Sequence, residues 1–449
     1  MAKQQEIDRL REENARLKAR LRYQERTARE GAFGSSTPSS KIPIKPNRAP
    51  EQPPRQGGAR PGHPGHGRRR ADRTGVERTE SVPVGEHCPH CGTTLQDKGH
   101  LERTVLDVEP LRRQLIRYQL QQKYCPRCRR SVSARAPGVL PRHLLGNRLL
   151  AHLVVQHYLY GVTLGQLEHQ LGVGYGALVG ALHGLAKRLA PLMEQLVRDF
   201  RRAPVRHADE TGWRTDGHNG YAWLFCTGTM SLFRFRQSRS GQIAQQVLGG
   251  RRLAGVLVVD RYHGYNRSPC ALQYCYAHLL RDVEDLEKEF PNQPEIQRFV
   301  ATLAPLLARA MHLRGLALSA RQFRRLAAQT RCEIQTVINA PAQHPAIQKI
   351  QTLFREKAHR MYHWARDRAI PADNNRAERE LRPLVIARKV SFGSQSEAGA
   401  RTREVLMSVL HTLRKRTDDV TASFQRILDR LAADPHADLY QLLRRCDSS

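Results

Sequence analysis

Three acidic residues stand in stretches that suit metal-dependent chemistry on phosphates. Asp209 in HADETGW and Asp260 in VLVVDRYHGYN each fall at or just past the end of a short apolar run, and Glu378 in DNNRAERELRP opens a stretch rich in arginine. Carboxylate oxygens are ligands that Mg²⁺ prefers. In a chain with a formal net charge of +32, they would hold divalent cations beside a polyanion, which predicts chemistry on DNA phosphates.

A second set of candidate ligands is sulfur. Cysteines occur as two CPxC pairs, Cys88 with Cys91 and Cys125 with Cys128. Each pair lets two thiolates bind one tetrahedral Zn²⁺, and two pairs complete a four-cysteine site. The sequence between the pairs alternates like two strands, so we expect a zinc ribbon over residues 81–140. Four thiolates leave no open coordination position, which indicates a structural zinc.

The overall composition limits the class of protein. Lys and Arg number 74 against 42 Asp and Glu, which predicts attraction to nucleic acid or to anionic membrane. Membrane is the weaker choice, because no apolar run approaches the ~20 residues that span a bilayer, and the charged, helical N-terminus is unlike a secretory signal. The nine cysteines do not form a dense disulfide pattern. We expect a cytoplasmic, nucleoid-associated bacterial protein.

The first eighty residues divide by composition. Residues 1–30 lack Gly and Pro and carry an a/d heptad spacing, which predicts a short parallel coiled coil and a homo-oligomer of at least two chains, or alternatively a solvated single helix; the heptad residues are Ile7, Leu10, Asn14, Leu17 and Leu21. Residues 31–80 are rich in Ser, Pro, Gly and Arg and predict a flexible linker. Its basic run could track a phosphate backbone or be a soluble tether; the run is Arg68, Arg69 and Arg70.

Residues 141–200 predict helices separated by glycine-containing turns. Two short helices followed by a longer one are compatible with a helix-turn-helix that binds DNA, and equally with a small helical bundle.

After Pro204 the pattern changes to strands, and 201–291 predicts the first part of a catalytic core. A short strand ending near Asp209, a hairpin, a helix, a strand ending at Asp260, another strand and a helix follow in the order of a ribonuclease H-like mixed-sheet α/β fold. Asp209 and Asp260 would then project from neighbouring strand ends and could bridge two Mg²⁺ or Mn²⁺ ions. Trp213 and Trp223 are expected to be packing residues, with stacking on a flipped base as the alternative.

The third acid is separated from Asp260 by a long helical stretch. We interpret 292–370 as an all-helical insertion and 371–449 as the last part of the core. Asp373 is expected to cap the helix that carries Glu378, and Pro383 to end it. Glu380 is the rival of Glu378 for the third carboxylate.

At these residues the chain resembles the insertion sequence 66 family of DDE transposases. The resemblance is carried by DNNRAERELRPLVIARK, HADETGW and DRYHGY, and it spans nearly the whole chain. It implies that Asp209, Asp260 and Glu378 are metal-binding catalytic residues. It also implies that the basic residues after Glu378 lie near DNA phosphates; these are Arg382, Arg388 and Lys389.

YCYAH resembles a Cys-x-x-His element that many DDE transposases carry near the second aspartate. It makes Cys275 and His278 possible supporting residues, although both could be plain core residues.

The resemblance implies Mg²⁺-dependent cleavage and strand transfer at the ends of an insertion sequence. The partners would be double-stranded DNA, both terminal repeats and target, together with accessory proteins of the same element. One alternative is an inactive or domesticated DNA-binding protein derived from a transposase. Another is a nuclease that hydrolyses DNA without joining it to a target.

Overall fold

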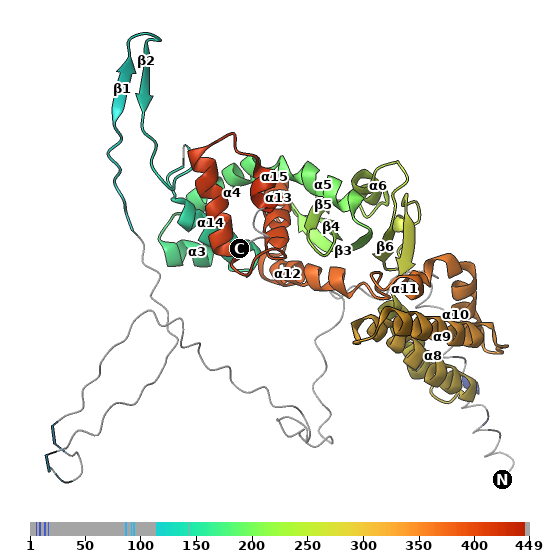
Figure 1. The fold of residues 1–449 in the computed structure, drawn as a ribbon. Helices are drawn as coiled ribbons and strands as arrows, with labels where there is room; N and C mark the ends of the chain where they lie inside the picture. Colours follow the sequence, from blue (N-terminus) through green and yellow to red (C-terminus); the bar gives the residue numbers. More distant parts are fainter. Residues whose placement is uncertain are drawn as a thin grey trace. The chain divides into compact units, whose positions relative to one another are not determined.

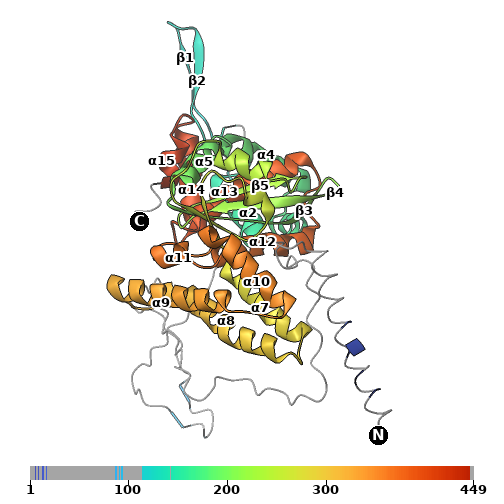
Figure 2. The same cartoon turned by 90° about the vertical axis from the view of Figure 1, so that its right-hand side faces the viewer.

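A five-stranded mixed sheet forms the centre of the fold (Figures 1 and 2). The computed structural model describes residues 114–141 and 143–444, together with residues 6, 9, 13, 14, 17, 86, 87, 91, 93 and 94. The strands lie in the order β5-β4-β3-β6-β7. Their bounds are β3 Val205–Thr215, β4 His218–Cys226, β5 Ser231–Arg236, β6 Val256–Val259 and β7 Ala271–Tyr274.

The strand order places β3 beside β6, as expected from the sequence. The pairs β3–β4 and β4–β5 are antiparallel, whereas β3–β6 and β6–β7 are parallel. All four residues of β6 are buried, as expected of a parallel strand that is covered on both faces. This mixed α/β arrangement with many helices is consistent with a ribonuclease H-like core.

The expectation of a short strand that ends near Asp209 is wrong. β3 continues for six residues to Thr215, because its second half pairs with β4 across a two-residue turn. Asp216 and Gly217 form this turn with φ of 50° and 76°, the positive values that a type I′ hairpin requires. Asp209 therefore lies in the middle of the strand.

Helices cover both faces of the sheet. On one face, Phe200 of α5 (Leu192–Arg202) packs against Phe225 of β4 with ring centroids 5.6 Å apart. The other face is covered by α12 (Asn375–Ser391), which contacts β3 and β4. Trp213 and Trp223 are both buried, so the prediction that they are packing residues is confirmed.

The free edge of β5 is covered by α13 (Glu397–Leu413). Along this edge, backbone N–H groups of alternate residues donate to α13 side chains. Phe233 donates to Ser408 Oγ at 2.9 Å, and Ser231 to Thr412 Oγ1 at 3.1 Å. These bonds satisfy an edge that would otherwise be open to another strand.

The helices expected before the sheet are present. They are α2 Asn147–Tyr158, α3 Leu164–Leu171 and α4 Tyr175–Leu189. α2 packs on α14 (Val420–Ala433), where Asn147 Nδ2 donates to Asp429 Oδ1 at 2.8 Å. A further short helix, α15 (Leu439–Arg444), contacts α14 and α5. A helix-turn-helix function for this region stays a prediction.

The segment between β7 and α12 is helical, as expected, and Figure 2 shows its helices as a group beside the sheet. They are α7 Tyr276–Glu289, α8 Pro294–His312, α9 Ala320–Asn339, α10 Pro345–Glu356 and α11 His363–Arg366. A short helix, α6 (Gln242–Leu248), joins β5 to β6.

Pro383 does not end its helix, which corrects a second expectation. It lies inside α12, which continues to Ser391. The carbonyl that loses its N–H partner belongs to Arg379, an exposed residue, so water can solvate it. Leu384, directly after the proline, is fully buried and anchors the second half of the helix.

The N-terminal predictions fall mainly outside the described residues. Glu6, Arg9, Glu13, Asn14 and Leu17 are helical, but Ile7, Leu10 and Leu21 are outside the described part, as are Arg68, Arg69, Arg70 and Cys88. The coiled coil and the basic linker therefore stay predictions. Within the described residues, no helix has the length and apolar character needed to cross a membrane.

Candidate active site

Two of the three acids lie at the same edge of the sheet. The parallel pairing of β3 with β6 ends at His207 and Val258, and Asp209 follows two residues later. Asp260 comes directly after β6 and is 3% exposed. The backbone N–H of Glu210 donates to Asp209 Oδ1 at 2.9 Å, and that of Tyr262 donates to Asp260 Oδ1 at 3.0 Å. Both carboxylates are thus oriented by neighbouring backbone.

The acids act on one another electrostatically. Burial raises the pKa of Asp209 well above its ordinary value, and the negative charges of Asp260, Glu210 and Glu378 raise it further. Burial also raises the pKa of Glu378; Arg281 opposes this effect, while Asp373 and Asp260 add to it. Crowded carboxylates of this kind are stabilised in their charged form by a bound cation. An all-oxygen set fits Mg²⁺ or Mn²⁺.

The start of α12 brings Glu378 to this edge. The N-cap residue of α12 is Asn374, whose side chain makes no capping bond, so the expectation that Asp373 is the cap is wrong. Asp373, the residue before the cap, still accepts a hydrogen bond of 3.0 Å at Oδ1 from the backbone N–H of Asn375. Glu378 lies in the first turn, and its backbone N–H donates to the Asn374 carbonyl at 3.2 Å.

Asn374 joins the first turn of α12 to the strand that carries Asp209. Its Nδ2 donates to the Ala208 carbonyl at 2.9 Å, and its Oδ1 accepts from His207 Nδ1 at 2.9 Å. Its backbone N–H donates to Cys275 Sγ at 3.1 Å. Asn374 is fully buried, so these bonds are shielded from water.

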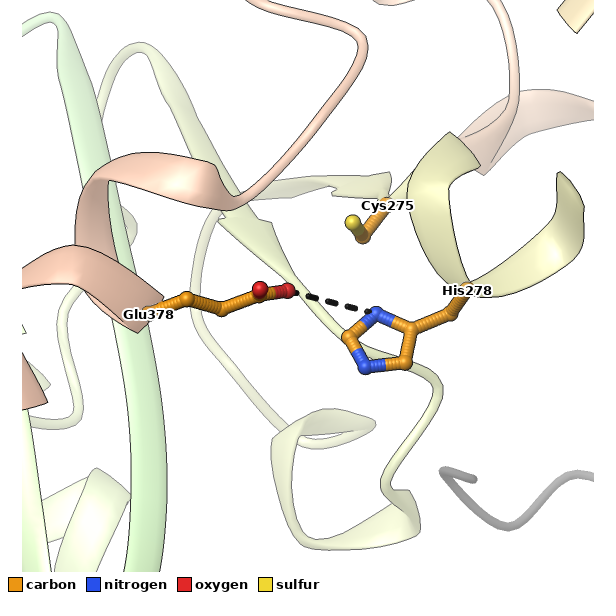
Figure 3. Close-up of side chains that lie close together, drawn as sticks. All are labelled: Cys275, His278 and Glu378. Carbon is orange, nitrogen blue, oxygen red and sulfur yellow. Dashed lines mark ion pairs between the residues drawn. The ribbon is translucent and has the colours of Figure 1, made fainter. Parts of the chain in front are cut away.

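Cys275 and His278 lie beside Glu378 (Figure 3). Cys275 is the N-terminal cap residue of α7, and His278 is in its first turn. One ligand atom from each residue lies within 4.8 Å of the others. Burial, with the nearby charges of Arg281 and Arg261, lowers the pKa of His278 to about 4, so its imidazole is neutral at pH 7.

Sequence reasoning missed Glu210, the neighbour of Asp209. Successive strand residues point to opposite faces, so Glu210 faces away from α12. It accepts 2.7 Å hydrogen bonds from Arg239 Nη2 and from the hydroxyl of Tyr265. Burial and the charge of Asp260 raise its pKa to about 7, and Arg239 opposes them. Glu210 is visible in the HADETGW stretch, but its hydrogen-bond partners Arg239 and Tyr265 lie in other segments and could not be inferred from it.

Glu380, the rival candidate, belongs to a different cluster. It accepts a hydrogen bond from Ser231 Oγ at 3.1 Å, lies 3.3 Å from Lys415 Nζ and bonds His411 Nδ1 at 3.2 Å. Burial alone would raise the pKa of Glu380, but the His411 bond and the Lys415 charge outweigh it and lower the pKa to about 2. A carboxylate already held this way is poorly suited to bind a metal.

The basic residues of α12 differ in their surroundings. Arg382 and Lys389 are exposed, so their side chains are accessible to a phosphate backbone. Arg388 is partly buried, and its Nη1 donates to the carbonyl of Gly212 and, at 3.3 Å, to Thr211 Oγ1. A role near DNA stays a prediction for all three residues.

The predicted zinc ligands are described in part. Cys125 and Cys128 lie at the turn between β1 (Gln122–Cys125) and β2 (Arg130–Ser133), an antiparallel hairpin. The backbone N–H of Cys128, the Cys128 thiol and the backbone N–H of Arg127 all face the Cys125 sulfur and lower the pKa of its thiol. Cys91 lies within a separate short turn bracketed by the pairing of His87 with Thr94. The zinc ribbon stays a prediction.

Comparison with known proteins identifies relatives of the chain. A model of the family described as "Transposase IS66 family" matches residues 142–402. The chain is 25% identical over 390 residues to "Uncharacterized protein y4jD" of Sinorhizobium fredii, covering 78% of this chain and 76% of that protein. It is 26% identical over 410 residues to "Uncharacterized protein y4qI" of the same organism, covering 80% of this chain and 73% of that protein. Neither name states an activity.

Proposed function

The chain belongs to the IS66 family of transposases, and we propose that it is a DDE transposase that cleaves the ends of its insertion sequence and joins the freed 3′ ends to target DNA. The observation that supports this proposal is the Asn374 bond that ties the Glu378 helix to the strand of Asp209, together with the electrostatic coupling of Asp209, Asp260 and Glu378. The three acids come from two neighbouring strands and a helix far along the chain, yet their charges act on one another. Such an arrangement at the edge of a mixed sheet supports a ribonuclease H-like active site.

These three acids would hold the divalent cations that the family implies. Bound Mg²⁺ or Mn²⁺ favours deprotonation of the attacking water or 3′-hydroxyl and offsets charge on the phosphate oxygens. Hydrogen bonds within the chain hold the acids in position. Tyr262 holds Asp260 through its backbone N–H, and Asn374 joins the Glu378 helix to the Asp209 strand.

Double-stranded DNA would lie along a surface that includes the exposed cations of α12. Arg382 stands one helical turn after Glu378, which puts it on the same side of the helix. Its charge would attract the phosphates that flank the scissile bond.

The remaining regions would support end recognition and assembly. We propose that the helices of residues 141–200 and a zinc ribbon over 81–140 bind the terminal repeats. The N-terminal helix would pair two chains, so that two DNA ends are held together. Accessory proteins of the same element would complete the active complex.

The test is a strand-transfer assay with the full chain. Labelled DNA that ends in the repeats flanking this gene would be incubated with supercoiled target plasmid and Mg²⁺. The proposal predicts covalent joining of the labelled 3′ ends to the plasmid. Cleavage without joining would indicate a nuclease, and binding of the ends without cleavage would indicate a transposase-derived DNA-binding protein.

A further inference from the structure

The first turns of α7 and α12 each carry a buried polar atom that no hydrogen bond within the described residues satisfies. His278 Nδ1 and Glu378 Oε1 are both buried, and among the described residues neither atom has a hydrogen-bond partner. Leaving two such buried atoms unsatisfied is energetically unfavourable, because each has lost its hydrogen bonds to water. They face one another at 3.9 Å, which is too long for a hydrogen bond (Figure 3).

A third potential ligand lies at the same place. Cys275 Sγ is fully buried, and it lies with the His278 and Glu378 atoms inside a cluster whose separations are all within 4.8 Å. Two ligands of one tetrahedral zinc stand roughly 3.3–3.7 Å apart, given bonds of about 2.0–2.3 Å. The separations in the cluster therefore exceed those of a bound zinc by about 1.5 Å at most, and small side-chain rotations would be needed to close it.

We propose that Cys275, His278 and Glu378 form a binding site for one zinc-type divalent cation, which shares Glu378 with the Mg²⁺ site of the three acids. Thiolate and imidazole ligands select Zn²⁺ over Mg²⁺. One thiolate and one carboxylate supply two negative charges, which balance the charge of the ion. Three protein ligands leave one tetrahedral position for water or another small ligand.

The ion would link the first turns of two helices. Cys275 and His278 begin α7, directly after β7, and Glu378 begins α12. Glu378 Oε1 would bind the zinc, while its second oxygen stays available to the site of Asp209 and Asp260. The ion would therefore hold the catalytic glutamate at one oxygen.

Zinc content of the full-length protein tests the site without any DNA reaction. The chain would be purified with zinc, dialysed against a weak chelator and analysed for metal per chain by mass spectrometry. We expect Cys275→Ser and His278→Ala each to contain one zinc fewer than wild type. The matched control is Cys332→Ser, an exposed cysteine of α9, which should keep the wild-type zinc content.

Co²⁺ substitution gives a second readout. We expect Cys275→Ser to lose part of the thiolate-to-cobalt absorption that Cys332→Ser retains, with thermal unfolding reporting that each variant is folded. If Cys275→Ser does not fold, His278→Ala decides the question. Equal zinc content in wild type and the folded variants would overturn the proposal, whether or not the protein transposes DNA. A protein that binds this zinc but performs no strand transfer would overturn only the proposed function.

Discussion

Asn374 Nδ2 donates a 2.9 Å hydrogen bond to the carbonyl of Ala208, and so joins the first turn of α12 to the residue directly before Asp209. The same side chain accepts from His207, while its backbone N–H reaches Cys275. One buried amide thus sets the position of Glu378 relative to Asp209.

Asn374→Ala should slow strand transfer by about 10- to 100-fold, the range seen when groups that orient metal ligands are removed. The concentration of Mn²⁺ or Mg²⁺ needed for half-maximal rate should rise, because Glu378 loses its fixed position, while affinity for end DNA stays unchanged. Titrating the metal in the strand-transfer assay measures this shift. Asn339→Ala, at the exposed end of α9, is the control. An unaltered metal requirement in folded Asn374→Ala would show that the junction is merely structural.

Variants of Glu378 and Glu380 should differ in their effects on strand transfer and on stability. Glu378→Gln should abolish strand transfer even at temperatures where the variant is fully folded, because it removes a metal ligand. Glu380→Gln should lower stability and leave strand transfer measurable at temperatures where the variant is folded, since Glu380 holds Ser231, His411 and Lys415. Loss of activity in folded Glu380→Gln with full activity in Glu378→Gln would reverse the assignment.

The stabilising effect of Glu380 should depend on pH. Its folded pKa of about 2 lies below the unfolded value of about 4.3, so its contribution is present above pH ~4.3 and is lost as pH falls toward 2. The shift corresponds to about 3 kcal/mol of unfolding free energy at neutral pH. Denaturant unfolding of wild type and Glu380→Gln should therefore differ most above pH 5 and converge at low pH. A constant difference across this range would be inconsistent with the ion cluster.

Much of this fold follows from local patterns. The four-residue apolar run of β6 and the strand order predict that Asp209 and Asp260 lie on or beside neighbouring strands. The choice of Glu378 comes instead from resemblance, because it fits the Asn-x-x-Glu spacing of the family. The length of β3 was also accessible, because Asp216-Gly217 is a strong hairpin signal. The roles of Asn374 and Glu210 were not, because their partners lie in segments far away along the chain, such as Ala208 for Asn374. No periodicity encodes such contacts.

The exposed cations of α12 should contribute to DNA affinity through phosphate neutralisation. Arg382→Gln and Lys389→Gln should each weaken binding of unrelated DNA sequences equally and reduce the slope of log K against log salt by about one. Arg388→Gln should instead lower stability, because its guanidinium bonds the Gly212 carbonyl of β3. Fluorescence anisotropy over a salt series measures the slopes. Wild-type slopes in the first two variants would exclude these residues from the DNA surface.

Replacing Cys125 and Cys128 together by serine should remove one zinc per chain and weaken binding of terminal-repeat DNA. The sheet and its acid site should stay folded, because the β1–β2 hairpin forms a separate two-stranded sheet. Metal analysis and circular dichroism test both statements. Retention of all zinc by this double variant would contradict the zinc ribbon.

The central claim is that Asp209 acts in metal-dependent strand transfer, and its most direct test compares two Asp→Asn variants that lie on the same hairpin. Asp209→Asn removes a carboxylate from the acid site, whereas Asp216→Asn changes an exposed turn residue whose positive φ asparagine accepts readily. With cognate ends and Mg²⁺, we predict that Asp216→Asn joins ends to target at the wild-type rate and that Asp209→Asn yields no joined product while still binding the ends. Full Mg²⁺-dependent joining by Asp209→Asn would contradict the account.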